Sequence, residues 1–394
     1  MLLLALLLAS TPLAARAEFD TVQLTSLEGK RESRPLAGFQ TKDPRELGAH
    51  VVQFDVSSAP IEAGPDTCAL ALAGGERWIG KLTAREGEEL AVTLLPGVVL
   101  LASIDELATL VYPKRIPAEW TGTLGPAKEG DRLYRVKGSA LDVLDGAIEE
   151  FTAQGVRFHG ARVDSRVFAW GEVAALYVEG LGAHAEKEDA AAGAPVRVEL
   201  VQGSRVKGAL AQIANGKLAL TARRGQAIEL SVGALREVFV DDGRAQWLSE
   251  VNPSRAEERK PFGDDLGMTW RHRIDQSVTG RALRAGGRAF AHGIGVHAPS
   301  TLAWKVEPAW KTLRGRVAID DETQTLAAHG AVLFRVLVDG KKAWESPVVR
   351  GGDPPLDLPA IELAGASELV LEVDTGPESF LGDRADWLEL LVVK

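Results

Sequence analysis

The last third of the sequence carries nine residues of the kinds that bind sugars. A sugar site needs planar groups that exchange hydrogen bonds with neighbouring hydroxyls, and an aromatic ring for the C–H face of the sugar. Carboxylate, imidazole, guanidinium and indole groups supply both contacts when loops bring them to one place. The candidates are Trp270, His297, Asp320, Asp321, Glu322, Arg350, Asp383, Asp386 and Trp387.

His297 follows the run Gly293-Ile-Gly-Val, in which two glycines let the backbone pass close to other groups. The histidine is equally suited to contacting a ligand and to making a structural hydrogen bond. The same stretch matches a Gly-x-Gly-x-x-Ala dinucleotide fingerprint. We reject a nucleotide site, because Pro299 and the strand-like run after it leave no helix to cap a pyrophosphate.

Three consecutive carboxylates, Asp320, Asp321 and Glu322, end a strand-like run. Adjacent carboxylates repel one another unless a cation or hydrogen-bond donors offset their charge. The triplet therefore suits either a hard cation or the hydroxyls of a sugar. A solvated acidic turn is the alternative.

The remaining candidates lie in turns or at the start of the last predicted strand. Asp383 lies in a loop and is a stronger contact candidate than Trp387, because a tryptophan at a strand position is more often part of the core than a platform. Asp386 stands beside that tryptophan. Arg350 lies before a glycine pair, where its planar fork would bridge two hydroxyls or pair with a carboxylate.

Short strands separated by Gly, Pro and Asp turns must position these residues. The strand-like runs are 303–306, 312–319, 331–338, 367–373 and 387–393. Their number and spacing predict a β-sandwich with a jelly-roll arrangement.

Four motifs in this region follow the order seen in the NPCBM/NEW2 family. They are Gly286–Ala298, Val317–Glu322, Val332–Gly340 and Gly382–Trp387. The region 265–394 therefore resembles that carbohydrate-binding module family, which occurs beside glycoside hydrolase family 98 catalytic domains and is related to carbohydrate-binding module family 51. The resemblance implies a galactose-binding-like β-sandwich that recognises a galactose-type sugar and has no catalytic chemistry. It also leaves a structural calcium ion open as a cofactor.

The residues before this region contain an internal repeat. When Gly80, Gly146 and Gly208 are set as a common origin, apolar pairs recur without a gap ten and twelve residues later, and again twenty-two and twenty-four residues later. Period-2 apolar pairs between turns predict strands. Each copy is expected to be a small antiparallel module of about five strands, similar to SH3-like or Sm-like barrels.

The whole chain is thus predicted to be all-β, with three SH3-like modules before the sandwich. The predicted segments are 18–118 for the first module with an N-terminal extension, 128–182 for the second, 195–252 for the third and 265–394 for the sandwich. Linkers are expected at 182–195 and 253–264, where the composition shifts.

Residues 1–17 are typical of a secretory signal peptide, with an apolar run followed by Pro12 and small residues. We therefore expect a secreted or periplasmic protein. The single cysteine, Cys68, cannot form an internal disulfide. The run 90–104 is too short to span a bilayer, so no membrane span is expected in the mature chain. A net charge of -10 argues against nucleic acid and anionic lipid as partners.

Common catalytic signatures are absent from the sequence. It contains no Gly-x-Ser-x-Gly elbow, no His-Glu-x-x-His pair and no phosphate loop, and the β repeats lack the βα alternation of a barrel enzyme. We therefore predict an exported, non-catalytic carbohydrate-binding protein. Two alternatives stay open: a structural protein that binds a protein partner through its N-terminal repeats and has a weak or lost sugar site, and an accessory subunit that targets a glycoside hydrolase.

Overall fold

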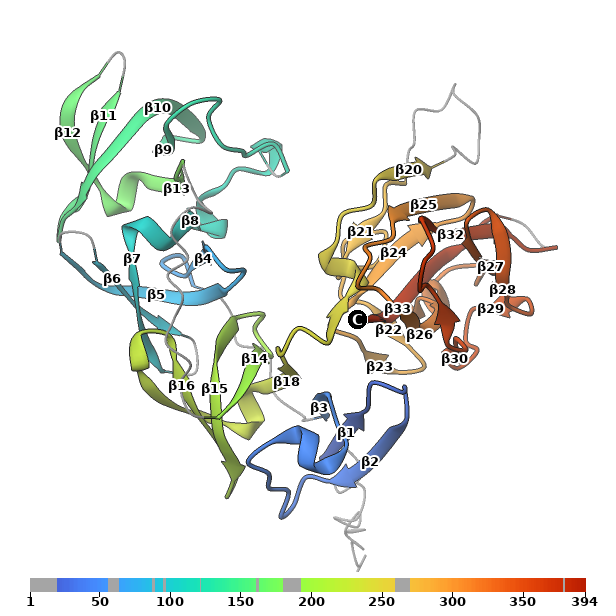
Figure 1. Cartoon of the computed structure of the whole chain (residues 1–394). Helices are drawn as coiled ribbons and strands as arrows, with labels where there is room; N and C mark the ends of the chain where they lie inside the picture. Colours follow the sequence, from blue (N-terminus) through green and yellow to red (C-terminus); the bar gives the residue numbers. More distant parts are fainter. Residues whose placement is uncertain are drawn as a thin grey trace, which may run out of the picture. The chain divides into compact units, whose positions relative to one another are not determined.

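The computed structural model describes residues 20–55, 64–86, 89–94, 97–120, 122–160, 163–179, 193–258, 270–377 and 380–394. The predicted signal segment 1–17 lies outside these residues. The described chain consists of β-strands and short 3-10 turns, which confirms the all-β prediction (Figure 1). No helix in the described ranges has the length and apolar character needed to cross a bilayer.

The chain divides into two units. The first unit comprises Met1–Ser26 and Arg31–Val240, and the second comprises Leu27–Lys30 and Asp241–Lys394. The boundary therefore falls before the predicted one, since the third module was expected to continue to residue 252. The reason is a strand pairing: β19 (Ala245–Trp247) adds to β33 (Arg384–Val393) of the second unit.

The first unit contains three consecutive groups of five antiparallel strands with one topology (Figure 1). Within each group the first four strands pair in chain order, each with the next. The fifth strand pairs with the first. The first group is β4 (Cys68–Leu72), β5 (Arg77–Glu86), β6 (Glu89–Leu94), β7 (Val99–Ser103) and β8 (Leu107–Val111). The second is β9 (Asp131–Lys137), β10 (Ala140–Phe151), β11 (Gly155–Gly160), β12 (Val163–Ala169) and β13 (Val173–Tyr177). The third is β14 (Ala194–Leu200), β15 (Arg205–Ala214), β16 (Lys217–Ala222), β17 (Ala227–Ser231) and β18 (Leu235–Val240).

Two irregularities recur at the same place in every group. The second strand contains a register shift, between Leu82 and Ala84 in the first group and at the corresponding points of the other two. A 3-10 turn separates the fourth and fifth strands, as in η3 (Ile104–Glu106). The assignment of these groups to the SH3-like or Sm-like class stays a prediction.

The glycine at the common origin of the repeat lies where two strands approach closely. A Cβ atom added to Gly80, Gly146 or Gly208 would come within 2.0 to 2.3 Å of a backbone carbonyl oxygen on the facing strand. The repeated glycine is therefore explained by backbone sterics, because only a residue without a Cβ fits this approach.

We expect Gly208→Ala to lower the free energy of unfolding of the third group by about 1–3 kcal/mol, the usual cost of overpacking a closely packed site. Hydrogen exchange of the β15 and β16 amides measures this change. Gly233→Ala is the control, because the nearest atom to its Cβ would be the Ser231 Oγ at 3.7 Å, an ordinary contact. Equal protection in the two variants would contradict the steric explanation.

The N-terminal extension joins the third group and not the first. Strand β1 (Thr21–Thr25) lies between β2 (Arg31–Pro35) and β3 (Val51–Asp55). Strand β3 then pairs with β18, with Val52 opposite Val238. The sequence prediction attached these residues to the first module because they precede it along the chain, but the apolar face of β3 is buried against a strand that lies far away in the sequence.

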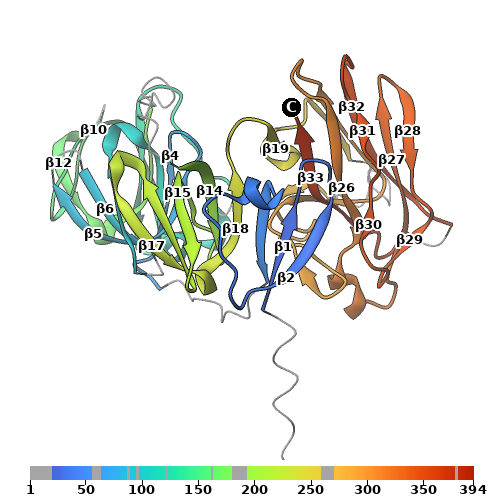
Figure 2. The same cartoon turned by 60° about the horizontal axis from the view of Figure 1, so that its bottom comes forward.

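The second unit is a sandwich of two antiparallel sheets (Figure 2). One sheet has the order β21 (Arg273–Ile274), β24 (Gly293–His297), β33, β26 (Thr312–Ile319) and β30 (Leu356–Asp357), with β19 and β31 (Ile361–Glu362) added. The other has the order β20 (Arg255–Glu258), β25 (Ser300–Lys305), β32 (Glu368–Thr375), β27 (Ala331–Val338) and β28 (Lys341–Glu345), with β29 (Val349–Arg350) added. The predicted linker 253–264 thus contains a strand, β20. A hairpin of β22 (Arg284–Ala285) and β23 (Arg288–Ala289) completes the unit.

The core of the sandwich lies between the two sheets. Apolar side chains from both sheets form one buried cluster, which includes Trp304, Val317, Phe334, Leu371 and Trp387. The alternation of buried and more exposed residues along β27 agrees with a strand that has one face in this core. The predicted sandwich architecture of this region is present in the structure.

Candidate functional site

Four connections meet at one end of the sandwich, which we call the loop end. They are the turn 298–299 after β24, the segment 320–330 between β26 and β27, the turn 350–353 after β29, and the connection 376–383 before β33, of which residues 376–377 and 380–383 are described. Backbone hydrogen bonds join them: Ala298 N–H donates to Asp383 O at 3.1 Å, and Gly351 N–H donates to Gly330 O at 3.2 Å. The loop end contains or adjoins the predicted site residues with the exception of Trp387, which lies in the core.

Several of the predicted carboxylates are buried and hold the loops in place. The Asp383 side chain is fully buried, and its Oδ1 accepts a hydrogen bond from Ala331 N–H at 2.9 Å. Asp320 caps the 3-10 turn Asp321–Thr325 by accepting from Glu322 N–H at 2.8 Å. Asp321 accepts from the Gly286 and Gly287 N–H groups, which fixes the β22–β23 turn. These contacts position the backbone of the loop end.

Asp386 and Asp320 form a buried pair of acids. Asp386 is 1% exposed, and within the described residues neither of its carboxyl oxygens meets an N–H donor, so the neighbouring Asp320 carboxylate is its partner. Burial raises the pKa of Asp386 well above its ordinary value, and the negative charges of Asp320 and Glu322 raise it further. The raised pKa favours the protonated form of Asp386, whose O–H group can donate to Asp320.

Among the described residues, the acidic side chains of the loop end do not gather into a metal-binding cluster. Within the described part of the chain, no group of three or more His, Cys, Asp and Glu side chains has the geometry to hold a metal ion. The acidic triplet 320–322 is instead satisfied by N–H and O–H donors and by arginine. Glu322, for example, accepts from Thr279 Oγ1 at 2.5 Å and lies 3.3 Å from the Arg384 guanidinium.

Trp270, His297 and Arg384 lie together beside this ion pair. The Trp270 and His297 rings stack, with centroids 5.4 Å apart and planes 15° apart, and the Arg384 guanidinium is 5.7 Å from the Trp270 ring centroid. Strand pairing explains the arrangement, since His297 of β24 lies opposite Arg384 of β33. Trp270 keeps part of its surface exposed. We call Trp270, His297, Arg384 and Glu322 the aromatic cluster.

The His297 ring is held in one tautomer. Its Nδ1 lies 2.7 Å from Ala298 O, and a carbonyl oxygen only accepts, so Nδ1 carries the proton and Nε2 is left as an acceptor. Burial lowers the pKa of His297 below its ordinary value; the hydrogen bond to Ala298 opposes this effect, and the Arg384 charge adds to it. The neutral imidazole is therefore the form present at neutral pH.

Trp387 lies in the core and not on the surface. Its side chain is fully buried and meets Phe334 edge to face, with ring centroids 5.0 Å apart. This position agrees with the core alternative that the strand pattern favoured. A sugar on the surface cannot reach the indole.

A pocket of about 450 Å³ lies at the loop end. It is lined by Ala327, Ala328, His329, Gly330, Arg350, Gly351 and Leu381. Arg350 and His329 are exposed, and Leu381 is 52% exposed, which is unusual for a leucine. Of the predicted site residues only Arg350 lines this pocket.

Sequence reasoning missed three residues of the loop end: His329, Leu381 and Arg384. Arg384 stands inside the closing motif Gly382–Trp387, between two aspartates that are themselves predicted site residues. His329 and Leu381 lie outside the four motifs of the NPCBM/NEW2 resemblance. Only the folding of the connections brings them together with Arg350.

Comparison with known proteins identifies the family of the second unit. Residues 244–392 match the model of the NPCBM/NEW2 domain. This finding confirms the resemblance drawn from the ordered motifs and extends the domain toward the N-terminus. The extension includes β19 and β20, which pair with other strands of the NPCBM/NEW2 domain in the structure.

This chain spans only a small part of the curated relatives that it matches. A stretch of 122 residues, 30% of this chain, is 34% identical to part of alpha-1,3-galactosidase B from Akkermansia muciniphila and spans 15% of that enzyme. Among solved structures, a CBM51 from Clostridium perfringens GH95 in complex with methyl-galactose is 20% identical and covers 38% of this chain and 99% of its own, with a TM-score of 0.33. Tandem CBM51 modules of a family 98 glycoside hydrolase from Streptococcus pneumoniae are 16% identical and cover 38% and 47%, also with a TM-score of 0.33.

Proposed function

We propose that the chain is an exported, non-catalytic protein that binds a galactose-type glycan at the loop end of its NPCBM/NEW2 domain. The domain match supports sugar binding. The identity to a segment of an alpha-1,3-galactosidase supports a galactose-type ligand. The predicted signal segment supports export.

The aromatic cluster is the observation that carries this proposal. Trp270 offers a partly exposed indole for the C–H face of a sugar ring. His297 Nε2 accepts a hydrogen bond from one hydroxyl, and the Arg384 guanidinium, oriented by Glu322 at 3.3 Å, donates to another. The cluster thus supplies an apolar face, an acceptor and donors from rigid strands and their ends.

We expect Trp270→Ala to weaken binding to galactose-containing polymers by about tenfold or more, which is 1.4 kcal/mol per tenfold. Affinity gel electrophoresis of the full chain measures the retention. Trp344→Ala is the matched control, because Trp344 is a half-buried tryptophan of the same unit on β28. Thermal melting of both variants checks that the domain remains folded.

Three results would contradict the proposal. The first is a lack of retention of the full chain on every galactose-containing polymer tested. The second is equal retention of the Trp270→Ala variant and the parent chain. The third is release of reducing sugar from a retained polymer, which would contradict the non-catalytic part.

A further inference from the structure

The first group of five strands meets each of the other two groups around a local two-fold axis. Strands β8 and β13 pair antiparallel with Leu110 opposite Leu176, and both residues lie thirty positions after the repeat glycine. Strands β5 and β15 pair antiparallel with Arg77 opposite Arg205, and both residues lie three positions before that glycine. An antiparallel pair centred on equivalent residues relates the two groups by a two-fold rotation. The groups therefore associate through self-complementary contacts.

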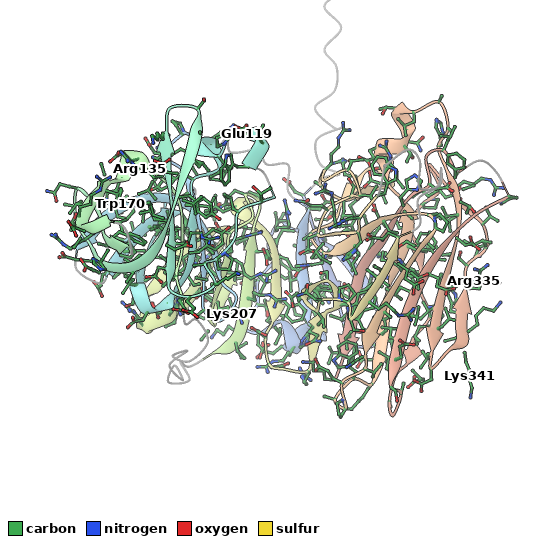
Figure 3. The ribbon with its side chains drawn as sticks, turned by 90° about the horizontal axis from the view of Figure 1, so that it is seen from above. Glu119, Arg135, Trp170, Lys207, Arg335 and Lys341 are labelled. Carbon is green, nitrogen blue, oxygen red and sulfur yellow. The ribbon has the colours of Figure 1, made fainter. Side chains whose placement is uncertain are left out.

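Side chains complete the contact between the first and third groups, where Lys207 is labelled in Figure 3. The Lys207 N–H donates to Glu76 Oε1, and the Ile79 N–H donates to Ser204 Oγ, both at 2.9 Å. Each of these hydrogen bonds runs from the residue before the repeat glycine of one group to the side chain four positions before the repeat glycine of the other. The two hydrogen bonds are therefore equivalent under the same two-fold rotation.

The second group has the same strand edge without a partner strand in the described part of the chain. Residues 140–146 of β10 pair with β9, whereas pairing with β11 begins only at Gly146. Val143 occupies the position of Arg77 and Arg205 on this edge, and it is 41% exposed. An open strand edge is a template for pairing with a strand of another chain.

The polar groups that join the first and third groups also have counterparts on this edge. The Asp145 N–H lies one position before the repeat glycine, and the Asp142 carboxylate lies four positions before it. Arg135, labelled in Figure 3, is the β9 residue opposite Asp142. Lys137 Nζ lies 3.4 Å from the Asp142 carboxylate. Arg132 Nε lies 2.6 Å from the Asp145 carboxylate, so each negative charge of the segment has a cation beside it.

We propose that the chain forms a dimer in which β10 of one copy pairs antiparallel with β10 of a second copy. Val143 lies on the two-fold axis opposite its counterpart, and each Asp142 carboxylate accepts a hydrogen bond from the Asp145 N–H of the other copy. The partner is a second copy because the contact is self-complementary and the first and third groups already fill this contact for each other. Two copies carry two NPCBM/NEW2 domains and are held more strongly on a polymer with many ligands, a consequence that rests on the proposed function.

Sedimentation of the full chain over a range of concentrations, without sugar, measures the association. We expect a dimer that dissociates on dilution, because the contact is small. Val143→Asp is expected to weaken the association by about tenfold or more, because it places like charges directly opposite each other on the axis. Val167→Asp is the matched control, since Val167 is a 38% exposed valine on β12 of the same group. It should associate like the parent chain.

Val143→Cys tests the position of the axis with a small side chain. Residues directly opposite each other in an antiparallel pair are close enough for a disulfide. Oxidation should therefore link two copies of this variant on a non-reducing gel and leave Val167→Cys unlinked. The native Cys68 is fully buried and should not react. If Val143→Asp fails to fold, the cross-linking alone decides between the outcomes.

Three results would overturn the dimer. The first is a parent chain that stays monomeric at every concentration. The second is an equal loss of association in the two aspartate variants, and the third is cross-linking of Val167→Cys in place of Val143→Cys. Because these measurements contain no sugar, none of the three results bears on the sugar site at Trp270.

Discussion

Trp387→Ala is expected to lower the free energy of unfolding of the second unit by about 3–5 kcal/mol, the usual cost of truncating a buried tryptophan. The side chain is fully buried and packs edge to face on Phe334 at the centre of the sandwich. Removing it leaves a cavity between the two sheets that the strands cannot close. Hydrogen exchange of the β24, β26 and β33 amides measures the loss in this unit alone.

Trp270→Ala is the control for this change, because Trp270 is partly exposed at the loop end and lies outside the core cluster. It should reduce sugar retention while the exchange protection of β33 changes little. If Trp387→Ala instead kept the protection of the parent chain and lost only sugar retention, Trp387 would be a ligand contact and not a core residue.

Asp386→Asn should make the second unit more stable than the parent chain at alkaline pH. The pKa of Asp386 is raised in the folded state by burial and by Asp320 and Glu322, so the folded state binds the proton more tightly than the unfolded state does. The stability from this proton is complete below the ordinary pKa of 3.8 and is lost as the pH rises through the folded-state pKa. An ionised carboxylate in this position costs several kcal/mol.

The amide that Asp386→Asn introduces stays neutral at every pH and has the shape of the protonated acid. The stability difference between variant and parent should therefore be smallest below the ordinary pKa of 3.8 and grow as the pH rises from there toward the folded-state pKa. Urea unfolding across this range, followed by exchange at β33, measures it. The control is Asp357→Asn, because the Asp357 side chain is 65% exposed. A difference that does not change with pH would show that Asp386 is ionised in the folded parent chain.

Local patterns were enough to predict the strands and the repeat. The apolar pairs at fixed distances from Gly80, Gly146 and Gly208 occupy buried strand positions, such as Leu90, Val156 and Leu218. Alternation predicts these positions because successive side chains of a strand point to opposite faces. The ordered motifs of the C-terminal region likewise led to the NPCBM/NEW2 domain.

The same patterns did not reveal which strands pair across long distances. Strand β3 pairs with β18, and β19 pairs with β33, although the sequence placed β3 with the first module and β19 with the third. An apolar strand face predicts that the strand is buried, but it does not predict which other strand lies beside it. Several strands of this chain have apolar faces of similar composition, so the partners of β3 and β19 were predicted from chain order. The structure pairs both strands differently.

The candidate sugar-binding residues likewise combine features that the sequence predicts with features that only the tertiary structure decides. Their residue types were evident from the sequence, and the structure brings them, with the exception of the core residue Trp387, to one end of the sandwich. Only the tertiary structure decided which of them face solvent: Asp320, Asp383, Asp386 and Trp387 are buried, whereas Trp270 and Arg350 retain exposed surface. The physical reason is that burial and pKa depend on neighbours supplied by other loops, such as Ala331 for Asp383 and Asp320 for Asp386, and no local pattern encodes those neighbours.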